Sequence, residues 1–261
     1  MVFSSSHMSS NKANAIAALS LLTALNFFNY IDRSILFAVQ PLVQKEFALD
    51  NSHIGFLTSA FMLCYVVAAP VIVPLADRYP RKWIMAAGAF VWSLATLLTA
   101  VTHSYDQLLL RYAIVGIGEA TFLAISPAFL SDLFSETIRG RVMGFFYVAT
   151  PVGTALGYVV GGFFGHRYGW RAPFMVSALP GLVLAFGVLA LREPLRGASD
   201  HLADTVERGT VRGLLRNSAF LTVTLGAALM TFAIGGVKAW MIPFQGNRAR
   251  VHPRRSDPSG C

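Results

Sequence analysis

Residues 15–39 read AIAALSLLTALNFFNYIDRSILFAV, an apolar run in which Asp32 and Arg33 stand side by side. The run is longer than the roughly 20 residues that a helix needs to cross the hydrocarbon core of a membrane. A charged side chain inside such a run costs about 2.5–3.5 kcal/mol to insert. The stretch therefore predicts a membrane-spanning helix whose two charges have a function.

The rest of the chain has the composition of an integral membrane protein. Of its 261 residues, 55% are hydrophobic and only 13% are charged, whereas a soluble domain carries about a quarter charged residues. Since backbone amides in lipid must bond within their own segment, each long apolar run is predicted to be a helix, and none alternates like a barrel strand. We expect seven spans, over residues 15–38, 54–76, 83–101, 108–131, 142–164, 172–191 and 217–237.

The loop charges predict that the N-terminus is cytoplasmic. With that orientation the inner segments hold most of the lysines and arginines, and the outer loops before the seventh span hold only Lys45, Arg167 and Arg171. The net charge of +8 then belongs mostly to a cytoplasmic face beside anionic lipid, so no nucleic-acid partner is expected. The predicted parts are a cytoplasmic tail over 1–14, a six-helix half over 15–191, a cytoplasmic linker over 192–216, a seventh helix over 217–240 and a disordered basic tail over 241–261.

The end of the chain departs from this charge pattern. Seven crossings would leave five basic residues outside, namely Lys238, Arg248, Arg250, Arg254 and Arg255. A re-entrant end, or an inside tail without a seventh crossing, would restore the pattern. A truncated or frameshifted reading frame would explain both the charges and the abrupt change of composition after Phe244.

The leading candidates for a functional site are the ionisable residues inside the spans, which are Asp32, Arg33, Arg111 and Glu119. Such residues usually face a bundle interior and mark substrate or proton pathways. On the first helix, one broad arc also carries Asn26, Asn29 and Tyr30, which predicts a face toward a cavity or toward partner side chains. The alternative is that Asp32 and Arg33 lie near the outer interface and extend their side chains toward it.

The two charges of the fourth span cannot pair well with each other. Arg111 and Glu119 are eight residues apart, which places them about 12 Å apart along a helix and about 80° apart around it. Each therefore needs a partner on another helix, and Asp32 and Arg33 are available. Arg111 is close to the outer end of its helix, so the alternative is that it only reaches the interface.

The fifth span combines a polar face with a ladder of glycines. Tyr147, Thr150, Thr154 and Tyr158 share a narrow arc that could line a cavity. Gly153, Gly157 and Gly161 recur at four-residue spacing, which favours close approach of another helix.

The loop between the second and third spans, PLADRYPRKWIM at residues 74–85, resembles the signature loop of the major facilitator superfamily. Pro74 and Pro80 stand where that pattern has glycines. The resemblance implies a cytoplasmic gate whose charged members match here as Asp77, Arg78, Arg81 and Lys82.

Four further stretches together resemble the Spinster branch of that superfamily, whose members are associated with lysolipid and sphingolipid export. They are NYIDR (29–33), GIGEA (116–120), SDLF (131–134) and RGRVMGFFYVATPVGTALGYVVGG (139–162), and the resemblance runs from about residue 15 to 243. Where the family usually has an arginine before GIGEA, this chain has Tyr112, and Arg111 stands one place earlier. That shift rotates the side chain by about 100°.

The fold class predicted from these observations is an all-α membrane protein, the N-terminal six-helix half of a major facilitator fold plus a seventh helix. The resemblance implies twelve helices in two halves, each an inverted repeat, with alternating access around a central cavity. We expect secondary transport of an amphipathic lipid-like or organic-anion solute, coupled to protons. Asp32 would be the protonation switch, with Arg33 or Arg111 as the moving cation and Glu119 as a second proton or substrate contact.

The alternative is an inactive or assembly-dependent half-transporter fragment, which would need a second half or a homodimer to complete a cavity. An enzyme is not expected, because no His pair, activated nucleophile or phosphate loop is present, and Gly116 and Gly118 begin their G-x-G inside a span. No cysteine or histidine spacing suggests a metal, and no cofactor is expected. The expected partners are the lipid bilayer, a small solute and protons.

Overall fold

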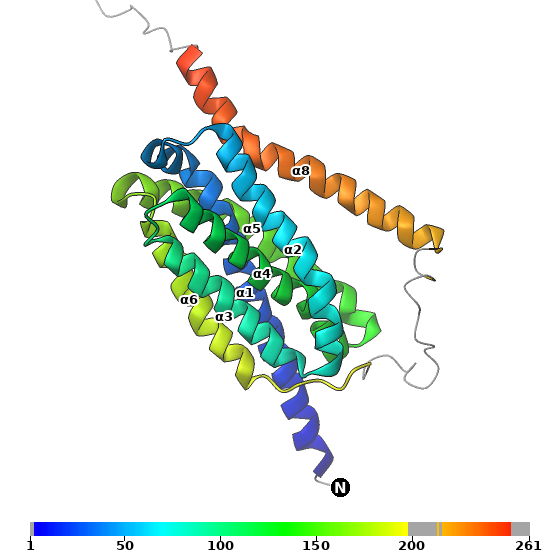
Figure 1. Ribbon diagram of the computed structural model, residues 1–261. Helices are drawn as coiled ribbons and strands as arrows, with labels where there is room; N and C mark the ends of the chain where they lie inside the picture. Colours follow the sequence, from blue (N-terminus) through cyan, green and yellow to red (C-terminus); the bar gives the residue numbers. More distant parts are fainter. Residues whose placement is uncertain (1–2, 198–212, 214–215, 252–261) are drawn as a thin grey trace, which may run out of the picture. The chain divides into compact units, whose positions relative to one another are not determined.

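The computed structural model describes residues 3–197, 213 and 216–251, and the described residues form seven α-helices and no strand (Figure 1). The first unit of the chain holds six of these helices and the second unit holds α8. All seven are long and apolar enough to cross a membrane, which confirms the all-α membrane class. Their bounds are α1 (Phe3–Phe47), α2 (Asn51–Arg78), α3 (Arg81–Thr99), α4 (Tyr105–Leu133), α5 (Glu136–Tyr168), α6 (Ala172–Ala190) and α8 (Ser218–Val251).

Two helices extend beyond the spans that were predicted for them. α1 begins at Phe3 and so includes most of the predicted tail over 1–14. α8 continues to Val251, so the predicted disorder over 241–261 is wrong for its first eleven residues. Residues 252–261 and most of the linker over 192–216 lie outside the described residues.

Local capping explains where several helices begin and end. Asp50 accepts a hydrogen bond from the backbone N–H of His53 at 2.9 Å and so caps α2. This bond and a second one from the His53 ring hold the pKa of the Asp50 carboxyl below its usual value. Ser104 caps α4 in the same way through the N–H of Gln107. α5 ends at Tyr168 and is followed by Gly169, whose φ of +86° is a conformation that residues with a side chain rarely adopt.

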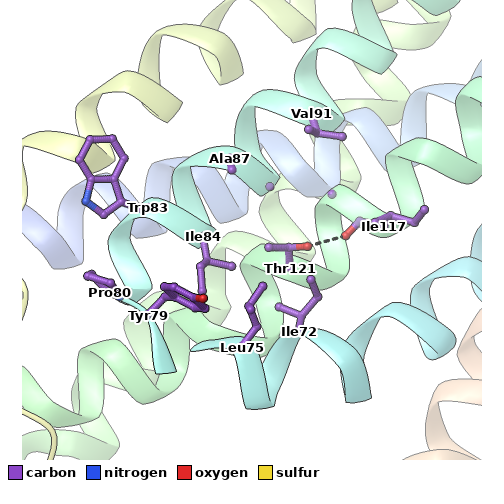
Figure 2. Close-up of a pocket in the computed structure, with 12 residues that line it drawn as sticks. Ile72, Leu75, Tyr79, Pro80, Trp83, Ile84, Ala87, Val91, Ile117 and Thr121 are labelled. Atoms are coloured by element: carbon purple, nitrogen blue, oxygen red, sulfur yellow. Dashed lines mark hydrogen bonds between the residues drawn. The ribbon is translucent and has the colours of Figure 1, made fainter. Parts of the chain in front are cut away.

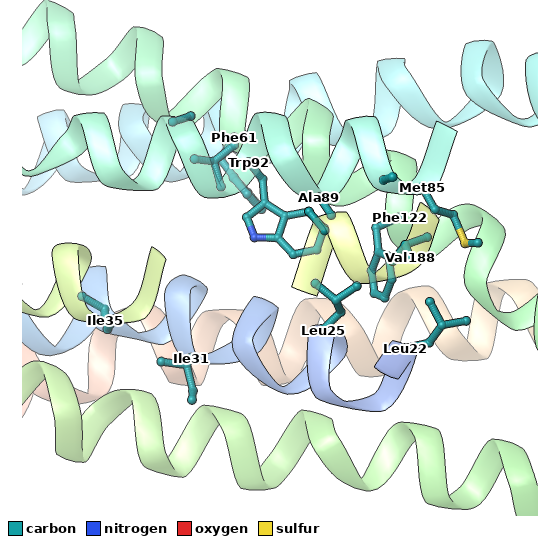
Figure 3. Packing of buried hydrophobic residues seen from close by; sticks show 14 of the residues in the cluster. Leu22, Leu25, Ile31, Ile35, Phe61, Met85, Ala89, Trp92, Phe122 and Val188 are labelled. Atoms are coloured by element: carbon teal, nitrogen blue, oxygen red, sulfur yellow. The ribbon is translucent and has the colours of Figure 1, made fainter. Parts of the chain in front are cut away.

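The first six helices pack in a few extensive pairs. α1 packs mainly against α5 and also against α6, while α4 packs against α2 and α3, and α3 packs against α6. The buried core joins these pairs, as Figure 3 shows around Trp92. The Trp92 and Phe122 rings meet edge to face with centroids 5.3 Å apart, and both are fully buried. Leu22 and Leu25 bring α1 into the same cluster.

The most extensive helix pair in this bundle is α1 with α5, and their close approach depends on glycine. A methyl group at Gly157 would lie 2.7 Å from the carbonyl oxygen of Ile31, and one at Gly153 would lie 2.6 Å from that of Phe27. At Gly161 the methyl would lie 2.6 Å from the Ala38 side chain. This confirms the predicted packing role of the glycine ladder, because a β-carbon at any of these positions would force the helices apart.

We therefore expect Gly157→Ala to lower the stability of the bundle by about 1–3 kcal/mol, the usual cost of overpacking. Gly162→Ala on the same helix is the matched control, because nothing lies within 4 Å of its added methyl group. Alanine also favours helix over glycine by about 1 kcal/mol, so the control is expected to melt at or above the wild-type temperature. Thermal unfolding in detergent checks both variants, and equal melting temperatures would contradict the proposed close contact.

Candidate functional site

The centre of the candidate site is an ion pair between α1 and α4. The Arg33 Nε atom donates to Glu119 Oε2 at 3.0 Å, and Arg33 Nη2 contacts the same oxygen. The Glu119 side chain is fully buried, while that of Arg33 is 19% exposed. The pair confirms the prediction that the charges of the first and fourth spans meet. It also explains how Glu119 is tolerated inside a helix, because a buried charge requires a partner.

Aromatic rings surround the same guanidinium. The Arg33 carbon Cζ lies 5.3 Å from the ring centroid of Tyr30, 4.9 Å from that of Phe61 and 5.5 Å from that of Tyr65. A cation over an aromatic face is stabilised by the ring quadrupole, more strongly when water is excluded. Phe61 and Tyr65 belong to α2, so Arg33 links three helices.

Asp32 points to a different part of the bundle from its neighbour Arg33. It is 3% exposed, and the polar side chains beside its carboxylate are Ser177 on α6 and Trp92 on α3. Neither carboxylate oxygen has a hydrogen-bond partner among the described residues. Successive helical residues are about 100° apart, so one charge of the pair faces α2 and α4 while the other faces α3 and α6.

The two asparagines predicted to line a cavity are fully buried. Asn26 donates from Nδ2 to the carbonyl oxygen of Phe146 at 2.9 Å, so it ties α1 to α5. Asn29 lies beside the Glu119 carboxylate. In this structure both asparagines therefore lie between packed helices, because α1 packs against α4, α5 and α6.

The polar face of α5 is more open. Tyr147 is 49% exposed, Thr150 and Tyr158 are half-buried, and Thr154 is 9% exposed. The hydroxyl oxygens of Thr150 and Thr154 are buried without a hydrogen-bond partner among the described residues. These groups are therefore available to a polar ligand or to water, as a cavity-lining role requires.

Arg111 does not join the central charges, contrary to the expectation that its partner lies on the first helix. It donates to Thr102 Oγ1 at 2.6 Å and also to the carbonyl oxygen of Leu98. Arg111 stands only six residues into α4, beside the end of α3, where backbone carbonyls lack intrahelical partners. This geometry matches the alternative that Arg111 reaches only the end of its helix.

The loop between α2 and α3 holds a second group of charges. Arg81 Nη2 lies 2.6 Å from Asp132 Oδ2 on α4, and Arg81 Nε lies 3.3 Å from Glu193 Oε1 after α6. The Glu193 carboxylate also accepts from the backbone N–H groups of Arg81 and Lys82, both at 3.0 Å. Lys82 Nζ donates to the carbonyl oxygens of Leu189 and Leu191. The network joins the ends of α3, α4 and α6.

Asp77 and Arg78 are exposed, and neither forms an ion pair within the part of the chain that the structure describes. Asp77 contributes its backbone carbonyl, which accepts a hydrogen bond from Arg196. Sequence reasoning missed the partners Asp132, Glu193 and Arg196, of which only Asp132 lay in a noted motif, SDLF.

Two surface grooves lie apart from these charges. A groove of about 470 Å³ between α2, α3 and α4 is lined by apolar side chains such as Ile72, Trp83 and Ile117 (Figure 2). A second, of about 910 Å³, lies between α2 and α4 and includes Phe56 and Tyr105. None of the four predicted intramembrane charges lines either groove. Among the described residues, no three His, Cys, Asp or Glu side chains are grouped so that they could hold a metal.

Known proteins resemble the chain in both sequence and structure. The family model of the Major Facilitator Superfamily matches residues 22–250. "Protein spinster" of Drosophila melanogaster is 36% identical over 225 residues, which is 85% of this chain and 37% of that protein. "Sphingosine-1-phosphate transporter SPNS2" of Danio rerio is 34% identical over 245 residues, which is 90% of this chain and 48% of that protein.

A solved structure shares the arrangement of helices. The crystal structure of a bacterial homolog to the human lysosomal transporter Spinster, inward-facing and unoccupied, matches with a TM-score of 0.79 and 26% identity. The match covers 92% of this chain and 56% of that one. The chain spans about half the length of the relatives it matches, and the predicted Spinster-like resemblance is confirmed. From its sequence match and its helical architecture, the chain belongs to the major facilitator superfamily.

Proposed function

We propose that the chain comprises the N-terminal six-helix half and a seventh helix of a proton-coupled secondary transporter for an amphipathic, lipid-like or organic-anion solute, with its N-terminus in the cytoplasm. The observation that carries the proposal is the Arg33–Glu119 ion pair, buried beside the unpaired carboxylate of Asp32. Intramembrane charges of this kind are costly, and they usually mark the path of a substrate or proton.

The surroundings of Arg33 support an anionic amphiphile as substrate. Glu119 occupies Nε and Nη2, and Nη1 makes no hydrogen bond among the described residues. A guanidinium with a free N–H can bind a phosphate or carboxylate. The rings of Phe61 and Tyr65 beside it suit an apolar chain. The zebrafish relative is named for sphingosine-1-phosphate, a molecule with a phosphate and a long apolar chain.

The balance of charge supports a proton as the coupling ion. Asp32 and Glu119 are two buried carboxyl groups, and the one cation beside them, Arg33, is bound to Glu119. Asp32 has no such partner, and an unpaired negative charge in an apolar interior is unfavourable. Asp32 would therefore carry a proton when the site is closed. Approach of Arg33 or of solvent to Asp32 during the transport cycle would release it. Asn26, Asn29 and the polar face of α5 would then line the path.

The loop between α2 and α3 would serve as the gate. Arg81 and Lys82 hold the ends of α3, α4 and α6 together, which makes a rigid base. Asp77 and Arg78 are exposed and would contact a second six-helix half in one of the two access states.

Replacing Asp32 tests the proton assignment. We expect Asp32→Asn to abolish the pH dependence of proton-driven uptake into vesicles, because the amide cannot load or release a proton. Asp106→Asn, at an exposed position in the first turn of α4, is the matched control and should transport like the wild type. An Asp32→Asn variant that transports with unchanged pH dependence would rule out the switch.

Replacing one member of the ion pair tests its energetic role. Glu119→Gln leaves the charge of Arg33 without a partner, so we expect a loss of about 2–4 kcal/mol in unfolding free energy, less than for a fully buried cation. The double variant Arg33→Gln/Glu119→Gln should recover part of that loss. Glu136→Gln, on the exposed start of α5, is the matched control. Denaturant unfolding in detergent measures these proteins together with the wild type and the single variant Arg33→Gln, and strictly additive effects of the two single changes would contradict the coupling.

A second candidate is an assembly-dependent half-transporter with no transport activity alone. It is favoured by the match to about half the length of the relatives. Native mass measurement in detergent, combined with uptake in vesicles, separates the candidates. We expect uptake only from preparations that contain a dimer or an added second half, because one half supplies only one wall of a cavity. Uptake by a verified monomer would contradict this expectation.

A further inference from the structure

Two helices, α3 and α6, bring uncharged polar side chains into the interior region around Asp32. Trp92 and Ser93 come from α3, and Ser177 comes from α6. All four residues, Asp32 included, are at least 97% buried.

Most of the polar atoms in this region lack partners. Both carboxylate oxygens of Asp32, the indole Nε1 of Trp92 and the hydroxyl of Ser93 are buried without a hydrogen bond among the described residues. An unpartnered buried polar group is costly and uncommon in proteins. A donor and an acceptor left unpaired in the same region indicate that they act on each other in some state of the protein.

Close packing of α3 on α6 holds these groups in place. Gly181 lies one turn after Ser177, and a methyl group there would collide with the Ser93 hydroxyl and lie 3.9 Å from Trp92 Nε1. The Trp92 ring is further held by its edge-to-face contact with Phe122 on α4, and it belongs to the same buried cluster as Leu25 of α1 (Figure 3). The indole N–H therefore has little freedom to turn away from this region.

We propose that Trp92 and Ser177 are positioning residues for the Asp32 carboxyl, and that they hold it in both of its protonation states. An indole N–H can only donate, so Trp92 stabilises the ionised carboxylate. A serine hydroxyl can donate and accept, so Ser177 serves either form. The Ser177 hydroxyl here donates to the Phe174 carbonyl oxygen at 3.4 Å, which leaves its lone pairs available to protonated Asp32.

The remaining groups that act on Asp32 come from other helices. Glu119 and Tyr112 face it from α4, and Arg33 is bound to Glu119. α5 also packs against α1 and carries Tyr147 and Tyr158 on its more open face. α3 and α6 contribute only the uncharged groups Trp92, Ser93 and Ser177. The inference rests on the proposed proton role of Asp32, and it adds the residues that set the pH at which that proton moves.

Infrared titration of the full chain in nanodiscs tests the proposal without requiring transport. The carboxyl band that is lost in Asp32→Asn identifies the Asp32 signal. Trp92→Phe keeps an aromatic ring and removes the N–H, so we expect the titration midpoint of that band to rise by about one pH unit, the value of one hydrogen bond to a charged group. Ser177→Ala, which disturbs packing less, is expected to raise it by a smaller amount, since the hydroxyl serves both forms.

Trp170→Phe is the matched control, because its indole donates to Glu46 at the other end of α1, and the Asp32 midpoint should not move. Circular dichroism establishes that each variant is folded. If Trp92→Phe does not fold, the titration midpoint of Asp32 in Ser177→Ala is the test of the proposal. A wild-type midpoint in the folded variants, or the absence of any titrating Asp32 band, overturns the proposal. Failure of the transport proposal is recognised separately, by uptake whose pH dependence survives Asp32→Asn.

Discussion

The positive charge of a guanidinium inside a membrane has to be balanced by other groups of the protein. The candidate site of this chain depends on the partners that balance the charge of Arg33. Glu119 supplies the opposite charge from α4, and Phe61 and Tyr65 supply aromatic faces from α2. Because lipid offers neither charge nor hydrogen bonds, these partners have to come from other helices. The pair thereby determines which faces of α1, α2 and α4 meet.

α1 makes a different kind of contact with each group of neighbouring helices. Arg33 faces α2 and α4, Asp32 faces α3 and α6, and the backbone near Ile31 lies against the glycines of α5. Adjacent residues on a helix diverge by about 100°, so the Asp–Arg dipeptide can serve two regions at once. Because the glycines of α5 have no side chains, α1 and α5 approach each other closely. This close packing fixes the position of α1 and of the charges that it carries.

A second group of contacts, between the α2–α3 loop, Asp132 and Glu193, holds the ends of three helices together. Glu193 accepts from two backbone N–H groups at the start of α3, where a helix has unpaired donors and a partial positive charge. Arg81 adds Asp132, so one short segment ties the ends of three helices. Asp77 and Arg78 lie beside this network and are exposed.

The sequence alone determined the membrane class, the number and approximate positions of the helices, the packing role of the glycines and the meeting of charges from the first and fourth spans. The first three follow from hydropathy and helical periodicity, which are properties of a single segment. The last follows from the cost of an unpaired charge, because few other intramembrane charges are available as partners. Only the tertiary structure decided that Arg111 bonds to the end of α3, that Arg81 pairs with Asp132 and Glu193, and that Asn26 bonds to α5. Each of these contacts joins separate helices or the segments at their ends. The rotation of a helix about its axis is set by packing against its neighbours, which the sequence of one segment does not encode.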